Sequence, residues 1–311
     1  MTFSSAEEFA LCSAVNDDFA VAYILMIHSF RRENPALRPR LYVIAESGEQ
    51  FLSPAAREMM LRWCGEIEFV DVDPLSYETV HMHARTTFKT PDRLMPAFYI
   101  LEAFNHPAER KVLCLDSDML IFGSLEEVFL AEGSFVAVRA RDASTGRPRA
   151  FVNTGVMLVD RERMNGLMTT DYVLDAIRDL TPRRGTGLAD QAIINLFMPN
   201  RRITYLPSIF NYTKRSLLIS YLRRHPENEY LLKAQCEIGT ADEMVACVEE
   251  DDIRILHFVG EKPWQIKQRS DERSFAAIDE IWWRELKALD DGELSGFVYG
   301  RMQSVLAAGV Q

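Results

Sequence analysis

The chain has 311 residues, of which 48% are hydrophobic and 26% charged, a composition typical of a soluble globular protein with a sizeable core. Its formal net charge of −11 argues against a general nucleic-acid binder, because such proteins use basic surfaces to displace counterions from phosphates. The five cysteines show no C-x-x-C spacing, so we expect reduced core residues rather than a metal or redox motif.

The N-terminal segment and the hydropathy of the chain bear on its location. Residues 1–10 lack the basic start and the long apolar run of a signal peptide. No stretch approaches about 18 uninterrupted apolar residues, so we expect no membrane-spanning helix. The sequence therefore predicts a cytoplasmic protein.

The first part of the chain alternates short apolar runs with helical patterns. Strands that alternate with helices indicate a parallel sheet, so the pattern predicts an α/β fold. We predict strands at residues 9–15, 41–45, 67–72 and 111–115, and helices at 20–30, after Ser53-Pro54, and at 92–104.

The pattern continues beyond the fourth strand. Ser124 and Glu127 have the spacing of a capping box, which predicts a helix start at Ser124. A polar segment with four arginines separates two later strands, and we predict a loop there that could face a substrate; the residues are Arg139, Arg141, Arg147 and Arg149. We predict strands at 135–138, 155–159, 203–206 and 254–257, helices at 171–179 and 190–197, and a mainly helical stretch at 214–250.

The C-terminal part, residues 273–311, carries a helical pattern around Ile281, Trp282 and Trp283 that we expect to pack onto the core. A helix that lies on a membrane needs a basic polar face. This tail is acidic instead, with Asp279, Glu280, Asp290, Asp291 and Glu293. Peripheral contact with the inner face of a membrane stays open, and the oligomeric state is not encoded in any pattern.

Asp116, Ser117 and Asp118 follow the apolar run 111–115 directly. Ligands of open α/β sheets bind at the carboxyl ends of the strands, so a site is expected at this point. Residues two apart in an extended segment point the same way, which lets Asp116 and Asp118 approach one hard cation. The same spacing occurs at Asp71 and Asp73, so the pair alone is weak evidence for a metal, and a solvated turn is the alternative.

Three further segments place polar groups beside predicted elements. Asn153-Thr154-Gly155-Val156 joins a polar pair to an apolar strand, and Asp190-Gln191 opens a helix. The segment 257–264 offers a metal-binding imidazole, a glycine that permits close backbone approach, and a lysine able to meet phosphate. Together these groups indicate a site for a diphosphate and a divalent metal.

With these four motifs in this order, most of residues 8–264 resembles glycosyltransferase family 8. This group contains bacterial lipooligosaccharide galactosyl- and glucosyltransferases, which act in lipopolysaccharide biosynthesis, and the self-glucosylating glycogen primer. Its members carry Asp-x-Asp after a strand, Asn-(Ser/Ala/Thr)-Gly-Val, Asp-Gln, and His-x-x-Gly-x-x-Lys-Pro-Trp. The resemblance implies a GT-A fold, which is Rossmann-like with a mostly parallel sheet flanked by helices. It implies a catalytic domain at residues 1–264 and a helical C-terminal extension at 265–311.

The resemblance also implies roles for the motif residues. Asp116, Asp118 and His257 would hold Mn²⁺, or Mg²⁺, which bridges the two phosphates of a UDP-sugar. The catalytic positions around the transferred sugar would be Asn153, Asp190 and Gln191. Contacts to the nucleotide and the donor would come from Val15, Asn16, Phe19, Arg93, Asp116, Ser117, Thr154, Gly260 and Lys262.

The sequence departs from the family pattern at the last motif. Only Glu261 separates Gly260 from Lys262, where the family has two residues, and this places a carboxylate beside the expected phosphate. The phosphate role of Lys262 is therefore open. The stretch 214–250 also looks longer than the family pattern requires.

The implied activity is that of a metal-dependent, retaining hexosyltransferase. It would move galactose or glucose from a UDP-sugar donor to a glycan or glycolipid acceptor. A binding scaffold and a self-glycosylating primer remain alternatives with the same site. A haloacid-dehalogenase-like phosphatase also uses strand-Asp-x-Asp, but Leu120 stands where that family has Thr or Val.

Overall fold

The computed structural model describes residues 9–142, 147–164, 170–177, 189–198, 202–265, 270–290 and 292–308. Residues 1–8, on which the signal-peptide prediction rests, lie outside these ranges. Residues 178–179 of the predicted helix 171–179 also lie outside them. Among the described residues, no helix is both long and apolar enough to cross a membrane.

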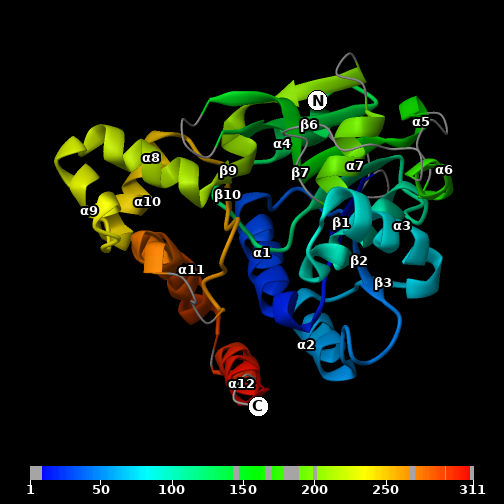
Figure 1. Ribbon diagram of the computed structural model, residues 1–311, viewed down its shortest axis with the longest axis horizontal. Coiled ribbons are helices and arrows are strands. Elements are labelled where there is room, and N and C mark those ends of the chain that lie inside the picture. The colour runs from blue at the N-terminus through cyan, green and yellow to red at the C-terminus, as the bar shows by residue number, and fades with distance from the viewer. Residues whose placement is uncertain are drawn as a thin grey trace.

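Within the described chain, a seven-stranded sheet in the order β3-β2-β1-β4-β7-β6-β8 forms the centre of the molecule (Figure 1). Strands β3, β2, β1 and β4 are parallel, β7 runs antiparallel to both β4 and β6, and β8 is parallel to β6. This mostly parallel sheet confirms the predicted α/β class. The strands are Phe9–Ala14 (β1), Arg40–Glu46 (β2), Glu68–Val72 (β3), Lys111–Leu115 (β4), Phe135–Arg141 (β6), Pro148–Asp160 (β7) and Ile203–Leu206 (β8).

Helices cover both faces of the sheet, so its central strands are apolar on both sides. In β4, Leu113 and Leu115 belong to one apolar cluster, and Val112 and Cys114 to the other, as the alternation of side chains along a strand requires. The first cluster includes residues of α1 (Ala20–Glu33) and α2 (Pro54–Cys64). The second includes residues of α3 (Glu78–His83), α6 (Thr170–Ala176), α7 (Ala189–Phe197) and the segment Asp92–Phe104.

The segment Asp92–Phe104 is helical as predicted, but it forms 3₁₀ turns rather than an α-helix. Pro96 lies inside it. Proline has no backbone N–H, and its ring clashes with the preceding turn of an α-helix, which accounts for the tighter winding.

A smaller sheet in the order β5-β10-β9 lies beside the large one. It consists of Met119–Ile121 (β5), Ile255–His257 (β10) and Tyr212–Thr213 (β9). The predicted helical stretch 214–250 is confirmed by α8 (Lys214–Arg224), α9 (Glu229–Lys233) and α10 (Ala241–Glu250). Two short helices, α4 (Glu126–Leu130) and α5 (Arg161–Met164), complete the connections.

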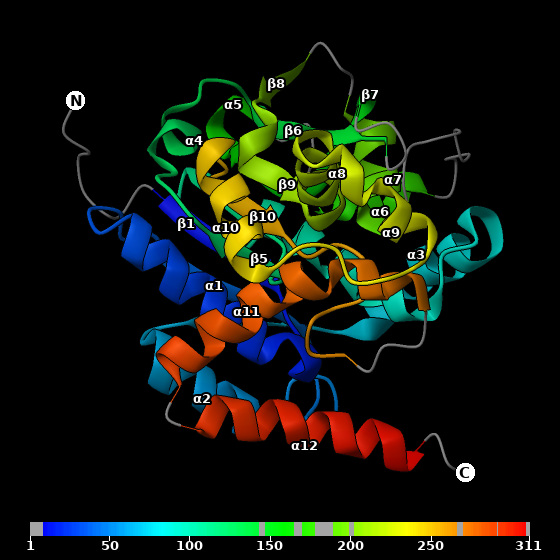
Figure 2. The same ribbon diagram turned by 90° about the vertical axis from the view of Figure 1, so that its left-hand side faces the viewer.

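The C-terminal helices are α11 (Ala276–Leu289) and α12 (Glu293–Ala308). They lie on the α1 side of the molecule, and Ile281 and Trp282 are buried in the same apolar cluster as α1 (Figure 2). Burial of each such side chain contributes about 1.5–3 kcal/mol. The predicted packing of this tail onto the core is confirmed, and the division of the chain at residue 264 stays a prediction.

The predicted capping box is wrong in detail. The Ser124 hydroxyl does accept a hydrogen bond from the Glu126 N–H at 3.2 Å, but α4 begins after Leu125 and has no side-chain cap. The Leu125 N–H donates instead to the Asn34 side-chain oxygen at 2.7 Å. This bond anchors the loop to the end of α1 and replaces the expected local cap.

The predicted arginine loop is also shorter than expected. Strand β6 extends to Arg141 and β7 begins at Pro148, so Arg139 and Arg149 lie within a β-hairpin. Arg139 stacks at 3.8 Å on the Tyr205 ring, and Arg149 pairs with Asp142 at 2.7 Å. These contacts let charged residues occupy strand positions that a sequence pattern assigns to a loop.

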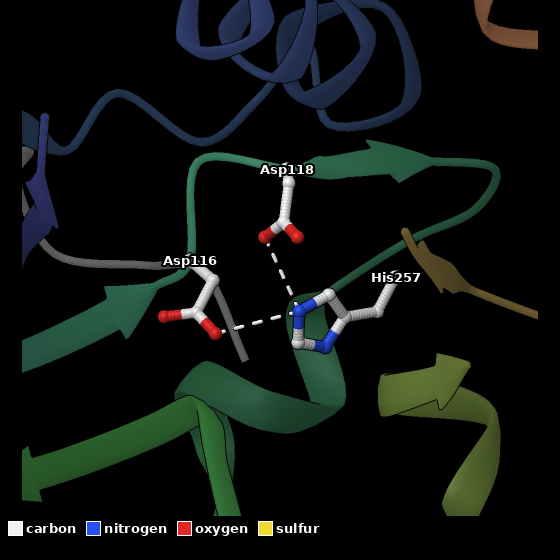
Figure 3. A group of neighbouring side chains, drawn as sticks. All are labelled: Asp116, Asp118 and His257. Atoms are coloured by element: carbon white, nitrogen blue, oxygen red, sulfur yellow. Dashed lines mark ion pairs between the residues drawn. The ribbon is translucent and has the colours of Figure 1, made fainter. Parts of the chain in front are cut away.

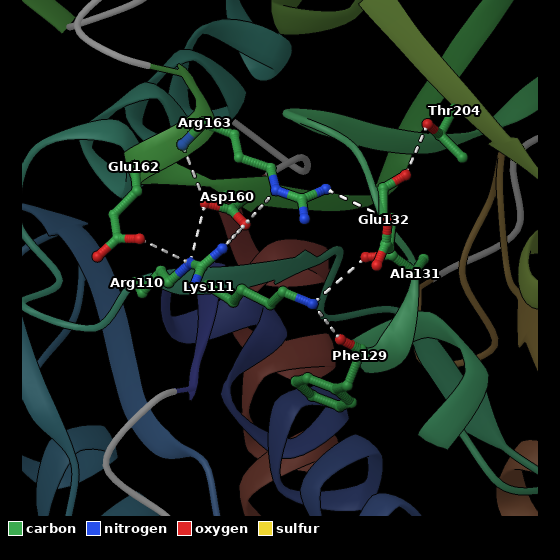
Figure 4. Close-up of polar contacts among 9 residues, drawn as sticks. All are labelled: Arg110, Lys111, Phe129, Ala131, Glu132, Asp160, Glu162, Arg163 and Thr204. Carbon is green, nitrogen blue, oxygen red and sulfur yellow. Dashed lines mark hydrogen bonds and ion pairs between the residues drawn. The ribbon is translucent and has the colours of Figure 1, made fainter.

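A charged cluster around Asp160 holds the start of β4 to the end of β7 (Figure 4). The Asp160 side chain is only 1% exposed, and it accepts hydrogen bonds from the Arg110 guanidinium at 2.9 Å and from the Arg163 N–H at 3.1 Å. Burial alone would raise the pKa of Asp160, but these bonds outweigh it and lower that pKa. The ionised form therefore stabilises the fold.

Replacing Asp160 by asparagine is expected to lower the free energy of unfolding by about 1.5–3 kcal/mol at neutral pH, the usual contribution of hydrogen bonds to a charged group. Because the pKa is lower in the folded than in the unfolded protein, this contribution is present above about pH 4 and is lost as the pH falls through the folded value. Urea unfolding of both proteins at several pH values measures it. Glu162→Gln, which removes an exposed partner of Arg110, is the control and should change stability by less than about 0.5 kcal/mol. Equal urea midpoints for Asp160→Asn and the parent protein would contradict the prediction.

Candidate active site

Asp116, Ser117 and Asp118 leave the carboxyl end of β4, where the fold places ligands. The Asp116 N–H donates to the Gly155 carbonyl oxygen at 2.9 Å, and the Asp118 carbonyl oxygen accepts from the Phe258 N–H at 2.9 Å. The segment is thus held from β7 on one side and from the chain after β10 on the other.

His257 meets the two aspartates because β10 pairs antiparallel with β5, which follows Asp118 directly. Its Nε2 lies 3.2 Å from Asp118 Oδ1 and 3.4 Å from Asp116 Oδ2 (Figure 3). One ligand atom from each of the three residues lies within 4.8 Å of the other two. His257 and Asp118 are buried, whereas the Asp116 side chain is 48% exposed. The cluster has the size and the donor atoms of a divalent-metal site that is open on one side.

Asn211, which no sequence pattern singled out, orients the imidazole. His257 Nδ1 lies 2.8 Å from Asn211 Oδ1, and Asn211 Nδ2 donates to Asn153 Oδ1 at 2.9 Å. The amide orientation that satisfies both contacts makes Nδ1 the protonated nitrogen and directs the Nε2 lone pair at the two carboxylates. A lone pair facing two carboxylates is stabilised by a cation between them, so the donor set fits a bound metal.

The Lys262 side chain also lies at the cluster of Asp116, Asp118 and His257. Its ammonium contacts the Asp118 carboxylate and donates to the Phe258 carbonyl oxygen at 3.0 Å. Burial alone would raise the pKa of Asp118, but the Lys262 ammonium outweighs it and holds that pKa well below its usual range.

The second and third motifs meet beside Asp116. Thr154 is hydrogen-bonded to the buried Asp190 carboxyl. Burial, together with the Asp116 carboxylate, raises the pKa of Asp190 to about 7. Asn153 Oδ1 accepts from the Gly155 N–H at 2.9 Å, and the partly exposed Gln191 follows Asp190 in the first turn of α7.

Gly155 also belongs to the site. The sequence motif Asn153-Thr154-Gly155-Val156 does not explain why this position is a glycine, but the structure does. A Cβ at this position would lie 2.6 Å from His257 Cε1 and 2.9 Å from Asp116 Oδ2. Both distances are below normal contact, so only glycine lets β7 pass this close to the cluster.

The loop after β1 meets the last motif. Val15 is buried, and its N–H donates to the Ile44 carbonyl oxygen at 3.0 Å. Asn16 Oδ1 is buried and, among the described residues, has no hydrogen-bond partner. The Phe19 ring meets Trp264 edge to face at 5.6 Å, and Lys262 Nζ lies 5.7 Å from the Phe19 ring centre. A donor site bounded by both segments would therefore lie next to the cluster.

The remaining predicted residues differ in their placement. Ser117 is buried between the two aspartates, and Gly260 adopts a φ of +96°, a conformation that favours glycine. Arg93 is exposed in the first turn of Asp92–Phe104, and no hydrogen bond or ion pair within the described chain joins it to the cluster.

The order and geometry of these motifs agree with comparisons to known proteins. Residues 10–268 match the sequence profile described as Glycosyl transferase family 8. The chain belongs to glycosyltransferase family 8. It is 25% identical over 180 residues, or 58% of its length, to Glycosyltransferase GlyB of Streptococcus pneumoniae serotype 4 (strain TIGR4), and it spans 39% of that protein.

Solved structures show the same fold as this family 8 glycosyltransferase. The galactosyltransferase LgtC in complex with donor and acceptor sugar analogs aligns with a TM-score of 0.59 and 19% identity, covering 93% of this chain and 99% of LgtC. The glycosyltransferase GlyE of Streptococcus pneumoniae TIGR4 aligns with a TM-score of 0.57 and 16% identity, covering 95% of this chain and 63% of GlyE. These likenesses confirm the predicted GT-A fold. Membership of the family disfavours the phosphatase alternative and makes a nucleotide-sugar the expected kind of donor.

Proposed function

We propose that this family 8 glycosyltransferase moves a hexose, galactose or glucose, from a UDP-sugar to a glycan or glycolipid acceptor, with retention of configuration and with a divalent metal, Mn²⁺ before Mg²⁺. The observation that carries the proposal is the cluster of Asp116, Asp118 and His257 beside a lysine and two polar motifs. Imidazole among the ligands favours manganese over magnesium.

The diphosphate end of the donor would lie at this cluster. A cation held by Asp116, Asp118 and His257 would supply Lewis-acid stabilisation of the UDP leaving group. Lys262 would turn from Asp118 toward the phosphates and share their negative charge. The short spacing between Gly260 and Lys262 is compatible with this role, because the ammonium reaches the cluster.

The nucleoside would lie against the loop after β1. The buried Asn16 Oδ1 is an acceptor in need of a donor, which the imide N–H of uracil can supply. The Phe19 ring offers an apolar surface to the nucleoside. The Asn16 acceptor supports UDP as the nucleotide, whereas the Phe19 ring would suit any nucleoside.

The transferred sugar would lie between the cluster and α7. Asn153, Thr154 and Asp190 offer the polar groups that orient sugar hydroxyls. The carboxamide of Gln191 is a poor nucleophile, so we favour attack by the acceptor on the face that the diphosphate leaves. The hydroxyl proton of the acceptor would then pass to the departing phosphate oxygen.

A panel of UDP-, GDP- and CMP-sugars tests the proposal, with thermal stabilisation and nucleotide release measured with and without Mn²⁺. We expect UDP-galactose or UDP-glucose to stabilise the protein only with the metal and to release UDP when an acceptor is present. Preference for a GDP- or CMP-sugar would refute the nucleotide assignment, and equal release with excess chelator would refute the metal. A mass increase of the protein itself after incubation with UDP-hexose would identify a self-glycosylating primer.

Removing the Asn211 side chain tests the fit of the metal site. Asn211→Ala is expected to weaken Mn²⁺ binding by about 10–100-fold, because the His257 ring loses the partner that fixes its orientation and tautomer. Isothermal titration with Mn²⁺ measures the affinity. Asn228→Ala, which removes a bond to the Tyr221 hydroxyl away from the cluster, should bind Mn²⁺ like the parent protein. Unchanged affinity in Asn211→Ala would show that Asn211 does not position the ligand.

A further inference from the structure

We propose that the C-terminal helices α11 and α12 position the donor site by holding both of its walls. The first wall is the loop after β1, residues 16–19, and the second is the last motif, residues 257–264. The inference rests on the proposed function, and it assigns to these helices a role beyond packing on the core.

The second wall is held by a buried ion pair. Lys214, at the start of α8, is 1% exposed, and its ammonium donates to the Glu261 carbonyl oxygen. The same ammonium lies 3.5 Å from Asp279 Oδ1 on α11, and Asp279 is 4% exposed. The backbone between Gly260 and Lys262 is thereby tied to α11 at the point where the motif is one residue short.

A contribution to the stability of the fold does not explain why Lys214 and Asp279 are both charged. Burying an ammonium and a carboxylate costs several kcal/mol for each ion, and apolar residues of similar size are often equally or more stabilising at such positions. What the pair does supply is a fixed direction for the Glu261 carbonyl group. That direction sets the path of the next residue, Lys262, whose ammonium reaches Asp118.

Two tryptophans of α11 contact the same wall. The Trp282 ring lies 4.8 Å from the ring of Trp264, and Trp283 Nε1 donates to the Pro263 carbonyl oxygen at 3.2 Å. Trp264 in turn meets Phe19 of the first wall at 5.6 Å. A shift of α11 would therefore displace Trp264 and, through it, Phe19, on both sides of the donor site.

Helix α12 holds the first wall from outside. The Arg301 guanidinium lies 2.6 Å from Asp18 and 3.7 Å from Asp17. Asp17 also accepts from the Ser53 N–H at 2.7 Å, so the loop is fixed between α12 and the start of α2. Asn16 and Phe19, the proposed nucleoside contacts, flank these two aspartates.

The experiment compares UDP binding, measured by titration calorimetry with saturating Mn²⁺, in three variants of the full chain. Lys214→Met combined with Asp279→Leu removes both buried charges at once, so that no unpaired ion is left in the core. Arg301→Gln removes the contact to the first wall at the surface. Arg284→Gln, which breaks an exposed pair between α11 and Asp242 on α10, is the matched control.

The double variant should bind UDP about tenfold more weakly and show a similar rise in the KM for the donor, because one charge-assisted hydrogen bond no longer directs the last motif. Arg301→Gln should weaken UDP binding by about threefold, the scale of an exposed ion pair. Arg301→Gln should not change Mn²⁺ binding without nucleotide, because Asp17 and Asp18 are not part of the metal cluster, whereas a general loss of structure would change it. Arg284→Gln should match the parent protein.

Cooperative thermal unfolding of each variant together with unchanged UDP affinity would overturn the inference. If the double variant does not fold, the Arg301→Gln result decides alone, since that side chain is at the surface. Failure of the parent protein to bind UDP would refute the proposed function and this inference with it, whereas binding by the parent protein and equally by all variants would refute the inference alone.

Discussion

Asp118→Asn is expected to abolish measurable Mn²⁺ binding and to reduce the rate of sugar transfer by at least about a hundredfold, since a metal ligand contributes several kcal/mol to leaving-group stabilisation. Asp118 is the buried carboxylate of the cluster, and it contacts both His257 and Lys262. Asparagine keeps its shape but removes the charge that attracts the cation. Transfer assays with UDP-hexose and titration with Mn²⁺ measure the two effects.

The chain provides its own control for this experiment. Asp71 and Asp73 repeat the Asp-x-Asp spacing at the end of β3, but both are exposed, and Asp71 pairs with Arg57. Asp71→Asn should leave Mn²⁺ affinity and transfer unchanged. Equal Mn²⁺ affinity in Asp118→Asn and the parent protein would remove Asp118 from the ligand set.

The contrast between the two Asp-x-Asp sequences shows what could be predicted from the chain. Asp116 and Asp118 follow β4, which is central and apolar on both faces, whereas Asp71 lies within the edge strand β3 and Asp73 follows it. The sequence shows that difference in the four consecutive apolar residues 112–115. The proximity of Asp116, Asp118 and His257 could be predicted because each belongs to a local motif next to a strand.

Asn211 and Lys214 could not be predicted in the same way. Asn211 reaches His257 because β9 pairs with β10, and β9 has only two residues, too few to show a strand period. The three-residue strand β5, which brings His257 to Asp118, is too short to predict for the same reason. Lys214 reads as the start of an ordinary helix, because its partner Asp279 lies in a different helix far along the chain.

The hairpin that contains Arg139 and Arg149 shows a second limit of prediction from sequence: strand residues can be mistaken for a loop. Arg139 and Arg149 lie outside the apolar runs 135–138 and 155–159 that predict the two strands. Stacking on Tyr205 and pairing with Asp142 supply partners that only the folded hairpin brings near. Polar strand ends of this kind are assigned to loops whenever their partners come from tertiary structure.

Gly155→Ala should have the second large effect, because the added methyl group would lie 2.6 Å from His257 Cε1 and 2.9 Å from Asp116 Oδ2. The pairing of β7 with β4 continues to the residue beside Gly155, so the backbone has little freedom to move away and the His257 ring must shift instead. We expect Mn²⁺ affinity and the rate of transfer to fall by about tenfold or more, as when other supports of a metal-binding histidine are lost.

Gly296→Ala is the matched control for Gly155→Ala. A Cβ on Gly296, which lies in α12, meets no atom within 4 Å, so this variant should keep Mn²⁺ affinity and gain up to about 1 kcal/mol from the higher helix propensity of alanine. Thermal unfolding and Mn²⁺ titration of both variants separate a local clash from a general effect of adding a methyl group. Gly155→Ala that binds Mn²⁺ as tightly as Gly296→Ala would show that His257 has room to move, and the second motif would then need another reason for its glycine.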